Sequence, residues 1–148
     1  MSRPAREQTV VQRDGRAKAY RPLPDHERRQ AIEDGLAAYA RDDWFLAHEL
    51  LEPAWMGTAD VAERELLQGL IKLAAAHVHL ARGNSAGYVK NLRGARQRVA
   101  NGLEAGATVG VYADALLAAI DGTLEPETGS GTGAAVRTAI AIPRRGAS

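Results

Sequence analysis

The chain lacks cysteine altogether. This absence excludes disulfide bonds, thiolate zinc sites and cysteine nucleophiles, and it is typical of the reducing cytoplasm, where we expect the protein. The sequence also has no apolar run of about eighteen residues, so we expect no membrane-spanning helix. The N-terminal stretch MSRPAREQTVVQRDGRAKAYRPLP has no apolar core of the kind that a secretory signal needs, and we expect no signal peptide.

An excess of one charge is also missing, since the net charge is only +1, but the charges are unevenly distributed. Residues 1–24 carry six basic and two acidic side chains, a net of +4, and residues 127–148 carry a net of +2, so residues 25–126 carry −5. Phosphate binding needs a cationic surface. We therefore do not expect the fold to bind nucleic acid, and we interpret the basic ends as solvated arms.

Alternating strand patterns of useful length are absent from residues 25–122, where apolar residues recur at helical spacing instead. Short polar breaks with capping residues separate the helical segments. Short loops between amphipathic helices predict an all-α, up-and-down bundle of four to five helices. The expected helices start at Asp25, run from Asp42 or Asp43 to Met56, run from Asp60 to Arg82, start at Asn84 or Ser85, and span about 108–121 with Gly122 at the end.

The bundle, residues 25–122, is predicted to be the one folded domain. Residues 1–24 form a basic arm that we expect to be irregular, and residues 123–148 form a Gly-rich linker with a basic tail. The apolar stretch VRTAIAIP in that tail can dock on the bundle as an extended segment. Helical bundles of this size often complete their core by pairing, so we expect a homo-oligomer.

The stretch FLAHELLEPAW places ionisable groups among aromatic residues on one predicted helix. Successive helix residues turn by about 100°, so His48 and Glu52 lie on one face, with Trp44 and Trp55 on that face and Glu49 at its edge. We expect this face to point inward. Burying an unpaired ionisable group costs several kcal/mol, so His48 and Glu52 should each have a partner.

One candidate partner is a divalent metal ion such as zinc. A His and a Glu four residues apart can reach one cation, as the two histidines of HExxH do, which leaves Glu49 as a general base on a bound water. A catalytic zinc needs a third protein ligand. The next helix offers His77 on its leucine stripe and His79 on the opposite face. His48 and Glu52 would then form part of a metal site with hydrolytic potential, whose substrate the sequence does not identify.

The other candidate partner is the protein itself. A hydrogen bond between His48 and Glu52 can satisfy both groups, with the indole N–H of Trp44 or Trp55 and the amide of Gln68 completing a network. The pair would then be structural, and the protein a non-enzymatic, homodimeric interaction or scaffold module.

Two stretches, FLAHELLEPAW and ERELLQGLIKLAAAHVHLARGN, resemble the small bacterial and archaeal family catalogued as domain of unknown function 309. The family hallmark HxxxExx(W/Y) is matched by His48, Glu52 and Trp55, and His79 stands where the family has a histidine. The resemblance covers about 35–105. It implies an all-α fold, a hallmark suggested to bind metal, and no established activity. It makes His79 the third ligand that we predict, and the residues predicted to surround the ligands are Trp44, Trp55, Gln68 and His77.

Overall fold

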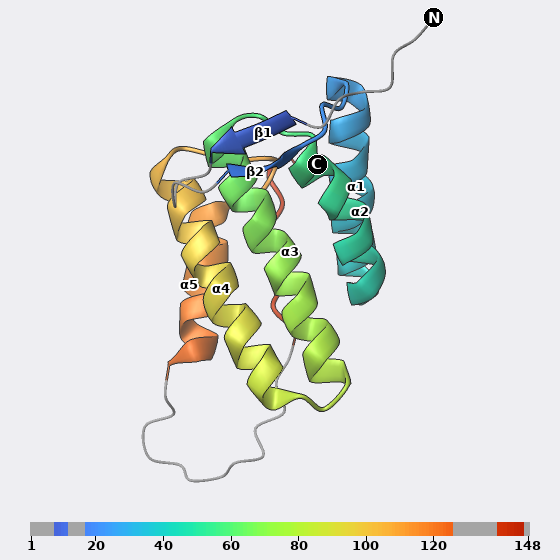
Figure 1. Ribbon diagram of the computed structural model, residues 1–148. Helices are drawn as coiled ribbons and strands as arrows, with labels where there is room; N and C mark the ends of the chain where they lie inside the picture. Colours follow the sequence, from blue (N-terminus) through green and yellow to red (C-terminus); the bar gives the residue numbers. More distant parts are fainter. Residues whose placement is uncertain (1–7, 12–16, 126–138, 147–148) are drawn as a thin grey trace, which may run out of the picture.

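The computed structural model describes residues 8–11, 17–125 and 139–146. Five helices in these parts of the chain each pack against the next in sequence order, so the predicted all-α, up-and-down bundle is confirmed (Figure 1). None of these helices is both long enough and apolar enough to cross a lipid bilayer. The helices are α1 (Asp25–Ala40), α2 (Trp44–Met56), α3 (Val61–Ala81), α4 (Ser85–Glu104) and α5 (Ala113–Leu124).

Side-chain caps start three of the helices. A side-chain oxygen of Asp43, Asp60 and Asn84 accepts a hydrogen bond from the backbone N–H three residues later, at 2.9 to 3.4 Å. These caps confirm the predicted starts of α2, α3 and α4. The predicted cap at Asp25 is wrong, because Pro24 takes the capping position and Asp25 is the first helical residue. In the first turn, its carboxylate still faces the positive end of the helix dipole.

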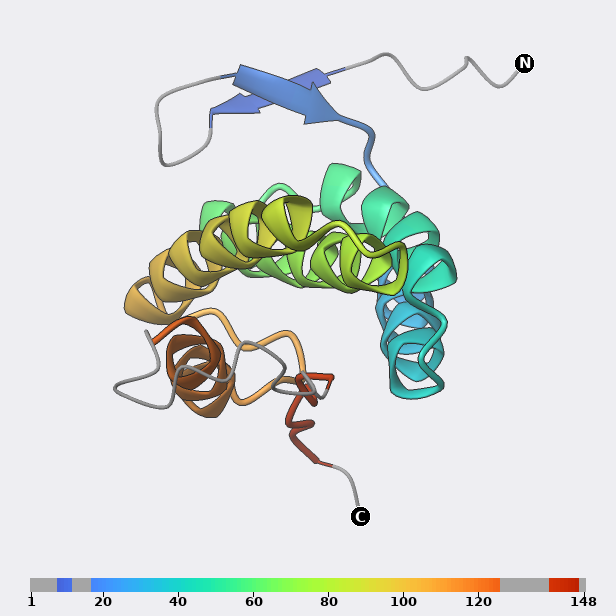
Figure 2. The same ribbon diagram turned by 90° about the horizontal axis from the view of Figure 1, so that it is seen from below.

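The N-terminal arm, predicted to be largely irregular, contains one short hairpin that the sequence did not predict. Strands β1 (Gln8–Val11) and β2 (Ala17–Tyr20) form an antiparallel hairpin. Each strand has only four residues, which is too short for an alternating pattern to stand out in the sequence. Figure 2 shows the hairpin on one side of the α3–α4 pair and α5 on the other. The rest of the predicted solvated arm, residues 1–7 and 12–16, lies outside the described residues.

Helices α3 and α4 cross closely at the centre of the bundle. A Cβ atom on Gly69 of α3 would lie only 2.7 Å from Cγ2 of Val99 on α4, so a larger residue would push the helices apart. The predicted apolar stripe of α4 faces α3 and is fully buried. The stripe consists of Tyr88, Leu92, Ala95 and Val99.

The C-terminal segment docks on the bundle beside the loop that precedes α5. The last helix starts at Ala113 rather than near 108, because Val111 pairs with Arg144 in an antiparallel bridge and Gly110 takes a positive φ of 74°. Docking of the apolar tail is confirmed for its described residues, since Ile140 is only 6% exposed. The predicted Gly-rich linker, within 126–138, lies outside the described residues.

Candidate metal site on α2

Three side chains with metal-binding atoms converge on one side of α2. Nδ1 of His48 lies 3.5 Å from Oε1 of Glu49 and 4.0 Å from Oε2 of Glu52. The three ligand atoms all lie within 4.8 Å of one another, and no other described residues form such a group of three. Ligands bonded at about 2.1 Å in a tetrahedral zinc site lie about 3.4 Å apart. Small side-chain rotations would therefore bring all three atoms onto one cation.

This group is half-exposed, so the expectation that it points into the core is wrong. The side chains of His48, Glu49 and Glu52 are 32%, 54% and 48% exposed, and Phe45 beside them is 58% exposed. A different face of α2, next to the one that carries His48 and Glu52, points into the core. It consists of small and aliphatic residues, which allow α1 and α3 to pack closely. These residues are Ala47, Leu51 and Ala54, all fully buried.

A cavity of about 240 Å³ opens between α2, α3 and α4, and we call it the polar cavity. His48, Glu52 and Trp55 line it from α2, and Gln68 lines it from α3. From the sequence, helical spacing put His48, Glu52 and Trp55 on one face, and Gln68 of the next helix was named as a possible partner. The other residues lining the cavity are Ile71, Lys72, Ala75 and Asn91.

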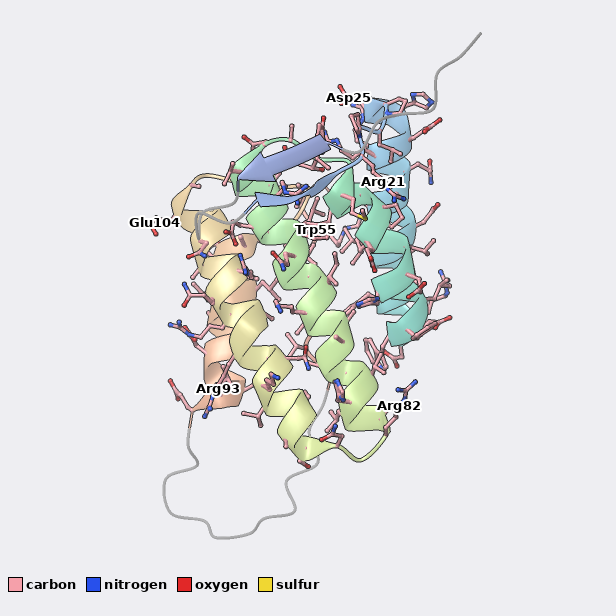
Figure 3. All side chains as sticks on the ribbon, viewed as in Figure 1. Arg21, Asp25, Trp55, Arg82, Arg93 and Glu104 are labelled. Atoms are coloured by element: carbon pink, nitrogen blue, oxygen red, sulfur yellow. The ribbon has the colours of Figure 1, made fainter. Side chains whose placement is uncertain are left out.

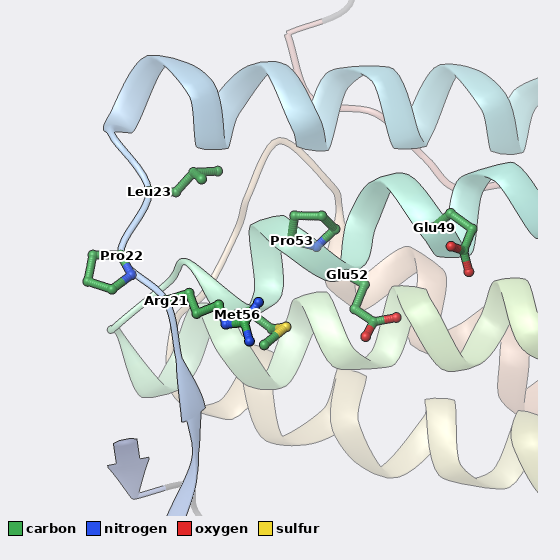
Figure 4. A pocket seen from close by; sticks show the side chains of 7 residues that line it. All are labelled: Arg21, Pro22, Leu23, Glu49, Glu52, Pro53 and Met56. Carbon is green, nitrogen blue, oxygen red and sulfur yellow. The ribbon is translucent and has the colours of Figure 1, made fainter. Parts of the chain in front are cut away.

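A second cavity of about 330 Å³ lies on the other side of the carboxylates, between α2 and the segment that leaves β2. We call it the linker cavity, and Figure 4 shows its lining from close by. The backbone N–H of Arg21 donates to the carbonyl oxygen of Met56 at 2.8 Å and holds the segment against the end of α2. Glu52 lines both cavities, so its carboxylate stands between them. The linker cavity is lined by Arg21, Pro22, Leu23, Glu49, Glu52, Pro53 and Met56.

A buried arginine fixes the end of α2 that carries Trp55. Arg64 of α3 is fully buried, and its Nη1 donates to the carbonyl oxygens of Trp55 at 2.9 Å and Thr58 at 3.1 Å. Its guanidinium also lies 4.7 Å from the centre of the Trp55 ring, within the range of a cation–π contact. These contacts hold Trp55 at the cavity wall between α2 and α3, near the top of α3 in Figure 3.

His79, the predicted third ligand, lies instead at the turn between α3 and α4. Nδ2 of Asn84 donates to its Nδ1 at 3.1 Å. A Cβ atom on Gly87 would lie 2.6 Å from the same nitrogen, so a glycine there leaves room for the imidazole. The structure does not bring His79 into the group formed by His48 and Glu52. The RGN sequence and His79 together build a helix–helix turn.

His77 lies in the core, where it binds the C-terminal segment. Its Nε2 accepts a hydrogen bond from the backbone N–H of Ile140 at 3.3 Å, and its ring stacks on Trp44 with centroids 4.6 Å apart. Burial lowers the pKa of His77, and the charge of Asp42 opposes this only in part. The imidazole is therefore a neutral acceptor. Tyr39 completes the contact by donating its hydroxyl to the Ile140 carbonyl at 2.5 Å. His77 and Trp44 thus belong to the docking site of the tail.

Sequence reasoning missed Lys72, Asn91 and Arg21 as residues near the carboxylates. Lys72 had a usable signal, because it follows Gln68 by one helical turn and shares its face. Asn91 and Arg21 had none, since their positions depend on how α4 crosses α3 and on where the segment after β2 runs.

Fold and site together define an all-α bundle with a His–Glu–Glu group on its second helix, beside two cavities. Residues 32–91 match the family model described as Domain of unknown function (DUF309), which confirms the resemblance seen in the sequence. The match includes the candidate site and leaves out the N-terminal hairpin, α5 and the docked tail. No curated protein and no solved structure matches the chain.

Proposed function

We propose that the protein binds a divalent metal ion through His48, Glu49 and Glu52. The convergence of one imidazole nitrogen and two carboxylate oxygens supports this proposal most directly. Imidazole and carboxylate are ligands that zinc takes in catalytic sites. The polar cavity and the linker cavity adjoin the group, so water or a substrate can reach the remaining coordination positions.

Glu49 is the third ligand in this proposal, in place of His79. Oε1 of Glu49 lies nearer to Nδ1 of His48 than the Glu52 carboxylate does. His79 is instead hydrogen-bonded to Asn84 at the turn between α3 and α4. The sequence suggested Glu49 as a general base. As a ligand, the Glu49 carboxylate could act as a base only after leaving the ion. We therefore assign Glu49 to the ion.

Hydrolysis is the reaction class that we propose for this site. A divalent ion with open positions supplies a Lewis acid that activates water and polarises a substrate oxygen. The side-chain amides of Gln68 and Asn91 line the same cavity as His48 and are suited to hydrogen-bond and orient a substrate. A cytoplasmic location and a homo-oligomeric state belong to this proposal as expectations.

The structural alternative has less support from the geometry. A distance of 4.0 Å between Nδ1 of His48 and Oε2 of Glu52 is too long for a hydrogen bond. Both side chains are also substantially exposed, so water can satisfy them and the fold does not depend on their pairing. A homodimeric scaffold would therefore have to rely on other contacts.

Zinc titration of tag-free protein by isothermal calorimetry, with elemental analysis, tests the proposal. We expect one ion per chain and at least about a ten-fold loss of affinity in Glu52→Gln and in His48→Ala. His26→Ala, at an exposed histidine on α1, is the matched control for adventitious binding. His79→Ala separates the two ligand sets, and we expect it to bind zinc like the wild type. Equal affinity in wild type and His48→Ala would refute the proposal.

A further inference from the structure

We infer that the metal-loaded site binds a small oxyanion, a phosphate or carboxylate group, in the polar cavity next to Lys72. This inference rests on the proposed metal site and names the class of ligand that the site accepts. The observations behind it are the position of Lys72, the charges around the two carboxylates, and the size and donors of the polar cavity.

Lys72 is held at the polar cavity by its packing against α4. A Cβ atom on Gly94 would lie 3.0 Å from Cδ of Lys72 and 3.6 Å from its Nζ, so the end of the Lys72 side chain lies against α4 at Gly94. The side chain therefore spans the gap between α3 and α4 at the wall that it shares with His48 and Glu52. A lysine stem can pack along a protein surface in this way while its ammonium group stays accessible to water.

Loading the site with a divalent ion changes its charge balance. Without an ion, Glu49 and Glu52 are matched by one cation in each adjoining cavity, Arg21 and Lys72. A divalent ion adds two positive charges to a balanced group. Attraction for an anion then becomes stronger than in bulk water, because the cavity is partly enclosed and the effective dielectric is lower.

The polar cavity suits an oxyanion in both size and hydrogen-bonding groups. Its volume of about 240 Å³ leaves room for one phosphate or carboxylate group. Lys72 offers an ammonium donor, and the amide of Gln68 lines the same wall. Trp55 also lines this wall, and its buried indole N–H has no acceptor among the described residues. The anionic oxygens of a phosphate or carboxylate accept hydrogen bonds, so donors at this wall suit them.

Calorimetric titration of the full-length protein with inorganic phosphate, and separately with acetate, tests the inference. The protein is first loaded with one equivalent of zinc, and unbound zinc is removed. We expect at least one of the two anions to bind the zinc-loaded protein at least about ten-fold more tightly than the metal-free protein. The anion that binds more tightly distinguishes a phosphate ligand from a carboxylate ligand.

Lys72→Gln is the decisive variant, and Arg93→Gln, at an exposed cation on α4 outside both cavities, is its matched control. Loss of one charge-assisted contact should weaken anion binding about ten-fold in Lys72→Gln but leave Arg93→Gln unchanged. Neither variant should bind zinc less tightly than the wild type, since Lys72→Gln removes a positive charge from beside the ligands. Normal zinc binding without anion binding, or anion binding that Lys72→Gln does not alter, would overturn this inference alone. Failure to bind zinc would overturn the proposed function and this inference with it.

Discussion

Two histidines on neighbouring helices of this bundle have opposite surroundings. His77 on α3 is 2% exposed, stacks on Trp44, and accepts a hydrogen bond from the Ile140 backbone. His48 on α2 has a side chain that is 32% exposed, and it faces the carboxylate of Glu52 at the mouth of a cavity. The same imidazole group therefore serves stability in one place and is available to a ligand in the other.

The difference shows that a histidine facing the core is not thereby a candidate metal ligand. His77 looked like a second metal-binding candidate because it lies on α3 opposite α2, yet its acceptor nitrogen is already used by the tail. His48 instead has the carboxylates of Glu49 and Glu52 beside it, and it is partly open to solvent. A histidine in a closed aromatic environment stabilises the fold, whereas a partly open histidine among carboxylates can exchange partners.

The largest effect that we expect is on stability. His77→Ala should lower the free energy of unfolding by about 3 kcal/mol, because it leaves a cavity beside Trp44 and removes the acceptor for Ile140. His48→Ala should cost less than about 1 kcal/mol, as is usual for a partly exposed side chain. Urea denaturation monitored by circular dichroism measures both. Equal losses would break the contrast between the two histidines.

The second effect is stabilisation by metal. Zinc at 100 times its dissociation constant should raise the free energy of unfolding by about 2.7 kcal/mol, because the ion binds the folded chain. His48→Ala should lose this gain, whereas His26→Ala should keep it. Thermal unfolding with zinc and with a chelator provides the measurement. A gain that survives His48→Ala would place the ion elsewhere.

The third effect is a pH dependence from His77. Its folded pKa lies below the unfolded value of about 6.5, so below that pH the unfolded chain binds more protons and stability falls as the pH is lowered. One proton limits the slope to about 1.4 kcal/mol for each pH unit. Urea denaturation between pH 7.5 and 5, at intervals of about half a unit, should show this slope in the wild type. His77→Gln should remove it, and an unchanged slope in that variant would contradict the assignment.

The smallest effect concerns the third histidine, His79, at the α3–α4 turn. Asn84→Ala should cost about 1 kcal/mol of stability, because it removes the cap bond to the Gly87 N–H and the contact with His79. Zinc affinity should stay at the wild-type value, as the turn is separate from the group formed by His48, Glu49 and Glu52. A loss of zinc affinity in Asn84→Ala would instead restore His79 as a candidate ligand.

Helix positions followed from the sequence because apolar spacing and caps act locally. The stripe ending at Val99 and the caps at Asp43, Asp60 and Asn84 needed no knowledge of the tertiary structure. The start of α5 was wrong because Val111 pairs with Arg144, a residue far along the chain whose position no local pattern reveals. Local rules fail where a distant segment competes for the backbone.

The candidate site was predictable in its residues more than in its surroundings. Helical geometry alone put His48, Glu52 and Trp55 on one side of α2, and all three line the polar cavity. The direction of that side was wrong, because small residues such as Ala47 took the core-facing position that the aromatic residues were expected to take. The placement of His79 depended on how far α3 extends beyond α2, which spacing within one helix does not specify.

Diffraction from crystals of zinc-loaded protein, measured on both sides of the zinc absorption edge, tests the central claim most directly. We predict one anomalous peak per chain, about 2.0–2.2 Å from Nδ1 of His48 and from carboxylate oxygens of Glu49 and Glu52. A peak bonded to His77 or His79 instead, or no peak near α2 in zinc-saturated crystals, would contradict it.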